Sequence, residues 1–138
     1  MRICPRCDTP IATSEFHCPR CAFEPKVSDG IVMFAPDLAE ENDDFPAQSH
    51  ETLDLAQEQS FWFRERNELI FRFAKKHMPE AKSLLEVGCG TGFVLSRFKK
   101  EFPAIRLAGG EIHMSGLRAA KRRLGEGVQL LQIDARKL

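Results

Sequence analysis

Two Cys-Pro-Arg-Cys segments near the N-terminus constrain this 138-residue chain more than any other feature. They pair Cys4 with Cys7 and Cys18 with Cys21, and ten residues separate the two pairs. A CxxC turn can present two thiolates to one tetrahedral ion at about 2.3 Å each, and a second turn completes the coordination. The spacing therefore predicts a metal site, with Zn²⁺ as the expected ion and iron as the alternative.

Disulfides and redox chemistry are weaker interpretations of the same cysteines. A disulfide within CxxC closes a very small loop, and the N-terminus carries no secretory signal. A redox CxxC needs a βαβ context that residues 1–26 lack. Because four cysteines leave no open coordination position, we expect a structural ion that supplies folding free energy on the order of 10 kcal/mol. The pattern resembles a zinc ribbon over residues 1–26, a fold that binds nucleic acids and proteins alike.

The net charge of zero conceals an uneven distribution along the chain. Residues 27–63 hold nine acidic residues and no lysine or arginine, whereas residues 64–138 hold sixteen basic and eight acidic residues. The acidic stretch could lie against the basic part and screen it. Acid-rich stretches without aromatic residues are more often solvated linkers, so we predict an acidic linker over residues 27–57.

The composition is that of a globular protein, with 43% hydrophobic and 29% charged residues. It excludes collagen-like and wholly disordered chains. The apolar runs are too short for a membrane span, which needs about 20 residues. We therefore expect a cytoplasmic protein that makes no membrane contact.

The remainder of the chain alternates strand and helix patterns. Residues 61–77 carry apolar side chains at helical spacing before Pro79, which predicts an amphipathic helix with its aromatic residues mainly in the core. Further strands are predicted at 83–87, 105–111 and 128–133, and further helices at 93–102 and 113–124. This β-α-β-α-β order predicts an α/β fold, a partial Rossmann-like domain with a parallel sheet.

A glycine-rich turn joins the first of these strands to its helix. Gly88 and Gly90 allow a tight turn that a ligand can approach, and Gly92 allows the helix start to pack near the strand. Glu111 ends the next strand, 23 residues after Gly88, where a carboxylate can accept hydrogen bonds from both hydroxyls of a ribose. Asp134 ends the third strand, where a carboxylate can meet an adenine amine. The three strand ends together predict an adenosine site.

These segments resemble the class I S-adenosylmethionine-dependent methyltransferases. The resemblance rests on LLEVGCGTG (84–92), GGEIHMSGLRAAKRR (109–123) and LLQIDARKL (130–138). It implies that Glu86 and the backbone of 88–92 serve the methionine half of the cofactor. It also implies Glu111 on the ribose, Ile112 against the adenine and Asp134 on the adenine amine. FWFRERN (61–67) is similar to the helix that precedes this domain in the family, which would bring Arg66 to the cofactor carboxylate.

The resemblance covers residues 58–138 and implies a sheet of seven strands in the order 3-2-1-4-5-7-6. The chain ends after the third strand, so we expect the N-terminal half of a methyltransferase domain. Its first strand would then be an open edge prone to self-association. The methyl acceptor, whether a small molecule, RNA or protein, and the catalytic residues stay unassigned. The alternative function is a zinc-ribbon module that binds protein or RNA and carries a non-catalytic half-Rossmann unit.

Three further features have both a functional and a structural interpretation. Cys89 stands at a helix start, where thiolates are acidified, but it is more simply a small buried residue. His113 is more simply a helix-start residue than a base. The basic residues of 118–123 could face RNA, although a solvated helix face is the more common role.

Overall fold

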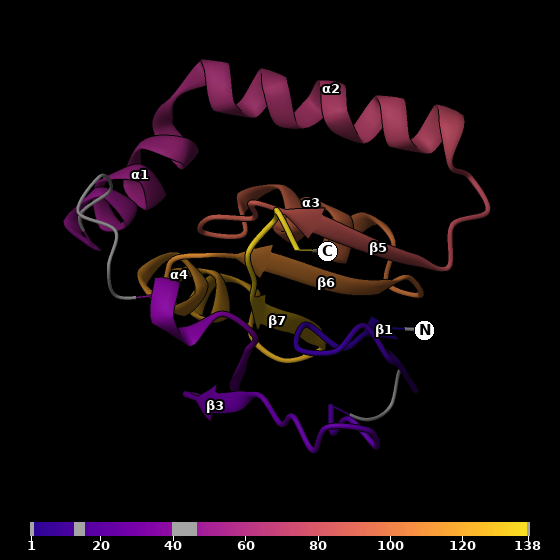
Figure 1. Ribbon diagram of the computed structural model, residues 1–138. Helices are drawn as coiled ribbons and strands as arrows, with labels where there is room; N and C mark the ends of the chain where they lie inside the picture. Colours follow the sequence, from indigo (N-terminus) through magenta and orange to yellow (C-terminus); the bar gives the residue numbers. More distant parts are fainter. Residues whose placement is uncertain (1, 13–15, 40–46, 138) are drawn as a thin grey trace.

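The computed structural model describes residues 2–12, 16–39 and 47–137, which form a twisted sheet with helices on one face and a small cysteine-rich unit (Figure 1). Its elements are, in chain order, β1 (Arg2–Ile3), β2 (Pro10–Ile11), β3 (Lys26–Ser28), β4 (Ile31–Met33), the 3-10 helix η1 (Pro36–Leu38), α1 (Ala47–Gln59), α2 (Phe61–His77), β5 (Ser83–Val87), α3 (Phe93–Glu101), β6 (Arg106–Glu111), α4 (Met114–Leu124) and β7 (Val128–Gln132). Within these described ranges, no helix combines the length and apolarity that a membrane crossing requires.

The main sheet has the strand order β3-β4-β7-β6-β5. Strands β5, β6 and β7 run parallel and are connected through α3 and α4. The predicted α/β fold with a parallel β-α-β-α-β unit is therefore confirmed. The carboxyl ends of these three strands meet at one edge of the sheet, which is where the predicted site residues lie.

Two short N-terminal strands extend this sheet beyond β7. β4 pairs parallel to β7, and β3 pairs antiparallel to β4. The fully buried side chain of Gln132 anchors the segment, because its Nε2 donates to Ala35 O at 2.8 Å and its Oε1 accepts from Ala35 N at 2.9 Å. The hairpin thereby covers backbone groups of β7 that an open edge would expose.

The described part of the acidic range packs against the basic helix α4. Arg123 is 12% exposed and pairs with Asp54 at 2.6 Å and with Glu58 at 3.0 Å, both from α1. Arg118 pairs with Asp29 at 2.8 Å. Asp29, Asp54 and Glu58 thus pair with α4, as the screening alternative predicts. Glu40, Glu41, Asp43 and Asp44 lie outside the described residues, and the linker assignment stays a prediction. The unit boundaries at residues 26 and 57 stay predictions.

A cluster of buried apolar residues lies between the sheet and helices α2, α3 and α4. Gly92 begins α3 with φ = 75°, and a Cβ there would lie 2.9 Å from Leu124 Cδ1 and 3.2 Å from Ala120 Cβ. Gly92 therefore lets α3 start against α4, while its predicted role in packing the helix start near the strand stays a prediction.

Helix α2 begins and ends as predicted, but its aromatic side chains are placed differently. Phe71 and Ala74 are buried, and Phe71 packs on Phe98 of α3 with ring centroids 5.8 Å apart. Trp62 and Phe73 are 57% and 62% exposed, so the prediction that most of these aromatic residues lie in the core is wrong for this pair.

Strand β5 forms the last strand at its side of the sheet. Among the described residues, no strand pairs with its outer edge, and Leu85 and Val87 are 49% and 43% exposed. The predicted open edge is present, whereas self-association through it remains a prediction.

Candidate functional site

The glycine-rich turn forms a tight, open loop between β5 and α3. Gly88 and Gly90 have φ angles of 75° and 50°, which only glycine adopts without strain. A Cβ at either position would meet no atom within 4 Å, so space lies open beside the backbone there. The turn is tied to the neighbouring strand because Gly88 N donates to Gly110 O at 2.7 Å. This is the geometry of a cradle that a ligand can approach closely.

Glu111 stands at the carboxyl end of β6, beside this turn. Its Oε2 accepts from Gly90 N at 3.1 Å, and its Oε1 accepts from Ile112 N at 2.7 Å and His113 N at 3.2 Å. Glu111 therefore links the glycine turn to the start of α4. A carboxylate offers about four acceptor positions, so a ribose hydroxyl would use the remaining one or displace a backbone group.

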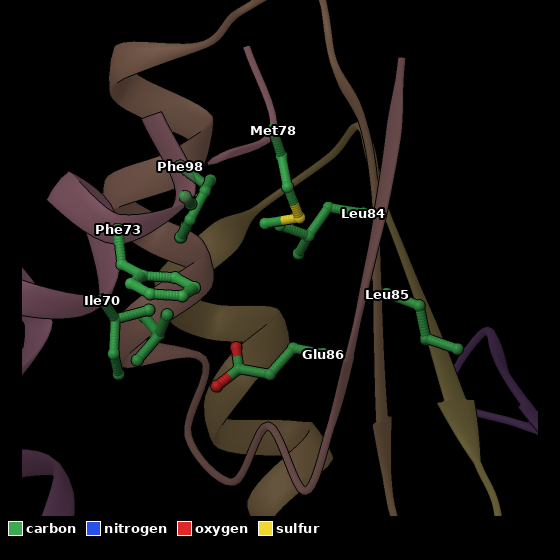
Figure 2. Close-up of a pocket in the computed structure, with 9 residues that line it drawn as sticks. Ile70, Phe73, Met78, Leu84, Leu85, Glu86 and Phe98 are labelled. Atoms are coloured by element: carbon green, nitrogen blue, oxygen red, sulfur yellow. The ribbon is translucent and has the colours of Figure 1, made fainter. Parts of the chain in front are cut away.

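Glu86 points from β5 into an apolar cavity of about 320 Å³ between α2, α3 and β5, beside Ile70 and Phe73 (Figure 2). Its Oε2 is buried and has no hydrogen-bond partner among the described residues. Burial raises the pKa of Glu86 to about 7, against the opposing effects of the Arg66 charge and the Leu95 backbone. A buried carboxyl with an unused oxygen is available to a polar or cationic group at this place.

Asp134 follows β7, and its carboxylate is hydrogen-bonded by Arg136, two residues further along the chain. Arg136 binds both carboxylate oxygens through Nε at 2.8 Å and a terminal nitrogen at 2.9 Å, and its backbone N–H donates at 3.0 Å. These bonds lower the pKa of Asp134 to about 2. An adenine amine would have to share or displace this clamp, which the sequence analysis did not foresee.

Helix α1 contributes two side chains to the same region. Thr91 Oγ1, fully buried in the glycine turn, donates to Gln57 Oε1 at 2.5 Å. The ring of His50 lies at the start of α4, where its Nδ1 shares a hydrogen bond of 2.9 Å with Ser115 Oγ. Sequence reasoning missed both residues, because they fall in the range assigned to the linker and match no motif.

The structure favours the simpler interpretations of Cys89 and His113. Cys89 is 5% exposed, and its Sγ lies 2.8 Å from where a Cβ on Gly109 would be. Burial raises the pKa of its thiol to about 12, which opposes a nucleophilic role. His113 is the residue before α4, and its ring lies 5.6 Å from that of His50.

The four N-terminal cysteines converge on one point. Their Sγ atoms all lie within 4.8 Å of one another, with Cys4–Cys21 at 3.7 Å and Cys7–Cys18 at 3.6 Å. Four sulfurs around one ion at about 2.3 Å are separated by about 3.8 Å from each other, close to these values. Disulfide bonds require about 2 Å, so the cysteines have the arrangement of metal ligands.

The two cysteine turns repeat one backbone pattern. Asp8 N donates to Cys4 O at 3.0 Å, and Ala22 N donates to Cys18 O at 2.9 Å. Asp8 and Ala22 both take a left-handed φ, 57° and 55°. The repeat places both thiol pairs in the same way on opposite sides of the site, which fits a closed tetrahedral centre.

The cysteine-rich unit lies over the sheet face opposite α3 and α4. Phe34, which follows β4, packs against Phe16 and Phe23 with ring centroids 5.6 Å and 6.5 Å apart. A cavity of about 810 Å³ separates the unit from Leu85 and Leu131 on the sheet. Phe34 thus joins the cysteine-rich unit to the rest of the fold.

Comparison with known proteins finds methyltransferases that are similar to part of the chain. No protein-family model matches it. It is 38% identical over 65 residues to a dTDP-4-amino-2,3,4,6-tetradeoxy-D-glucose N,N-dimethyltransferase of Saccharopolyspora spinosa, which covers 47% of this chain and 25% of that protein. It is similar, at 29% identity and a TM-score of 0.51, to SAM-bound CalS10, an amino pentose methyltransferase from Micromonospora echinaspora, over 72% of this chain and 39% of that one.

A third similarity concerns the fold alone. The plantazolicin methyltransferase BpumL, in complex with a desmethylPZN analogue and SAH, aligns at a TM-score of 0.50 and 19% identity over 67% of this chain and 39% of that one. The chain thus spans about a quarter of the length of its curated relative and two fifths of these solved structures.

Proposed function

We propose, for a chain related in sequence and fold to S-adenosylmethionine-dependent methyltransferases, that residues 58–138 bind S-adenosylmethionine and serve methyl transfer. The observation that carries the proposal is the hydrogen bond from Gly90 N to Glu111 Oε2 at 3.1 Å. It joins the glycine turn, proposed for the methionine half of the cofactor, to Glu111, proposed for the ribose.

The residues present fit this cofactor. Open space lies beside Gly88 and Gly90, where backbone can approach the cofactor, and Glu86 keeps a buried oxygen without a partner nearby. Glu111 would receive the ribose hydroxyls. Ile112 would lie against the adenine, and Asp134 would accept its amine.

The chemistry that S-adenosylmethionine supplies is a methyl group on a positive sulfonium. Glu86 and the backbone of 88–92 would hold the methionine half beside that methyl group. Glu111, Ile112 and Asp134 would hold the adenosine half. Methyl transfer depends mainly on holding the reactants in line. The roles proposed for this chain are therefore binding roles, and the catalytic residues stay unassigned.

We infer further that the acceptor is an amine. The support is the activity of one relative, a sugar N,N-dimethyltransferase, beside a second relative that is an amino pentose methyltransferase. A panel of nucleotide-linked sugars that differ only in an amino or a hydroxyl group at the accepting carbon tests this. Release of S-adenosylhomocysteine with the amino sugars alone would support the inference, and release with the hydroxyl sugars alone would refute it.

The test of the main proposal is calorimetric titration of the zinc-loaded chain with S-adenosylhomocysteine. Glu111→Gln should weaken binding by at least about 10-fold, because a charge-assisted hydrogen bond contributes roughly 1.5–3 kcal/mol. Glu101→Gln, on an exposed residue at the end of α3, is the matched control and should leave the affinity unchanged. Absence of binding by the wild-type chain would refute the proposal.

We also propose that Cys4, Cys7, Cys18 and Cys21 hold a structural Zn²⁺. The 3.6–3.7 Å sulfur separations support a closed tetrahedral site without an open position. The apolar core of this unit contains little beyond Ile11 and the cysteines themselves, with Phe23 packed against it. Metal binding would therefore supply much of its folding free energy.

The ion can be identified directly. Elemental analysis of the purified chain should give one equivalent of zinc and a colourless protein, whereas iron would give a coloured one. Cys18→Ser should lose the ion, and Cys89→Ser should retain it. Retention of a full equivalent by the Cys18 variant would refute the site.

A further inference from the structure

Helix α1 contacts both halves of the proposed cofactor site, although no motif marks it. Gln57 accepts a hydrogen bond from Thr91 in the glycine turn, and His50 shares one with Ser115 in the first turn of α4. The Arg123 pairs with Asp54 and Glu58 hold the rest of α1 on the same helix. Three kinds of contact thus fix α1 against the elements that carry the site.

The imidazole of His50 occupies the space that a side chain at Gly116 would fill. A Cβ on Gly116 would lie 2.9 Å from His50 Nε2 and 3.1 Å from His50 Cδ2. The same Cβ position lies 3.3 Å from Glu111 Cγ. The His50 ring and the Glu111 side chain therefore both lie against one backbone position, which brings His50 Nε2 within about 6 Å of Glu111 Cγ.

The surroundings of His50 favour a neutral ring. It is 4% exposed, and burial lowers its pKa, while Glu111 acts in the opposite direction and His113 in the same direction. Ser115, Glu111 and His113 are the polar groups that face it from α4 and the end of β6. A neutral ring would act on Glu111 through steric contact and its dipole, and it would leave the charge of the carboxylate unchanged.

We propose that His50 is a positioning residue for the cofactor: it holds Glu111 in the rotamer that joins the glycine turn to α4 and receives the ribose. This inference rests on the proposed function, because it assigns the braced carboxylate to cofactor binding. Gln57 acts in parallel on the other half of the site by fixing Thr91. Helix α1 is then part of the cofactor site and not a spacer between two units.

Two His50 variants separate positioning from mere packing of α1. His50→Asn keeps a polar group near the position of Nδ1, so it can retain the Ser115 bond, but it removes the ring edge that touches Gly116. His50→Gln keeps a polar group near the position of Nε2 and fills more of the space beside Gly116. Gln59→Ala, an exposed residue at the end of α1, is the control.

The first measurement needs no ligand. The backbone amides of Gly90, Ile112 and His113 donate to Glu111, so their hydrogen exchange reports whether its rotamer is held. His50→Asn should speed the hydrogen exchange of these three amides about 10-fold more than that of the amides within α4. His50→Gln should restore much of the protection. Unchanged exchange of these three amides would overturn the positioning role.

The second measurement is calorimetric titration with S-adenosylhomocysteine. His50→Asn should weaken binding by about 10-fold, the equivalent of one hydrogen bond, and by less than about 2-fold when Glu111→Gln is already present. An equal loss in both backgrounds would overturn the inference, because His50 would then act independently of Glu111. No binding by the wild-type chain would overturn the proposed function and this inference with it, whereas wild-type binding unaffected by His50→Asn would overturn this inference alone.

Discussion

The buried carboxyl of Glu86 should make the stability of this protein depend on pH in a way that one substitution removes. Burial raises its pKa from 4.5 to about 7 in the folded chain. Below pH 4.5 the group is protonated in both the folded and the unfolded state, so it costs nothing. Between pH 4.5 and 7 the unfolded state loses this proton while the folded state keeps it, so the unfolding free energy falls across this window and levels off above pH 7.

The shift of about 2.5 pKa units corresponds to about 3 kcal/mol, at 1.36 kcal/mol for each unit. Glu86→Gln keeps the shape of the side chain and cannot ionise. At pH 8 the variant should therefore be up to about 3 kcal/mol more stable than the wild-type chain, and at pH 4.5 the two should be equal.

Urea denaturation followed by circular dichroism at 222 nm, at several pH values with zinc present throughout, measures the difference. Subtracting the unfolding free energy of the variant from that of the wild-type chain at each pH cancels the contribution of all other titrating groups. Glu101→Gln is the control and should show no pH-dependent difference, because this side chain is exposed. A difference between wild type and Glu86→Gln that stays constant from pH 4.5 to 8 would refute the reasoning.

Three further predictions concern packing, charge and the sheet edge. Gly92→Ala should lower the unfolding free energy in thermal denaturation by about 3 kcal/mol, from left-handed strain plus the clash with α4. A loss of less than about 1 kcal/mol would contradict this packing. Arg123→Met should cost about 1–2 kcal/mol in urea denaturation, because this largely buried guanidinium binds two acids of α1. Arg118→Met, whose pair is half exposed, should cost less than about 0.5 kcal/mol, and equal losses would contradict this. If the chain self-associates through β5, Leu85→Lys should lower the sedimentation coefficient at high concentration, and an unchanged value would exclude this edge as the contact.

Sequence reasoning reached the parts of the fold that depend on neighbours in the chain. The strands, the helices and the glycine turn follow from apolar periodicity and turn residues within short windows. Glu111 and Asp134 were predicted from their places after strands, because parallel strands end at one edge of a sheet. The cysteine site follows from the spacing of two identical turns.

The features that sequence reasoning missed join residues far apart in the chain. The side chain of Gln132 binds Ala35, 97 residues away, and Gln57 binds Thr91, 34 residues away. The strand β3 has three residues, too few for a period to show, whereas the apolar run of 30–36 that holds β4 is consistent with a strand or a docked strap. The exposure of Trp62 and Phe73 on α2 likewise depends on which elements cover that helix.

The sequence by itself determined which chemical groups this protein holds and in what order along the sheet they occur. Spacing sufficed for that, because the local backbone geometry of a strand, a helix or a CxxC turn follows from a few adjacent residues. Only the tertiary structure decided that Asp54 of α1 pairs with Arg123 of α4, that Arg136 binds both oxygens of Asp134, and that Glu86 is buried beside an apolar cavity. These outcomes depend on burial and on contacts between distant segments, which are properties of the packed chain and leave no period or motif in the sequence.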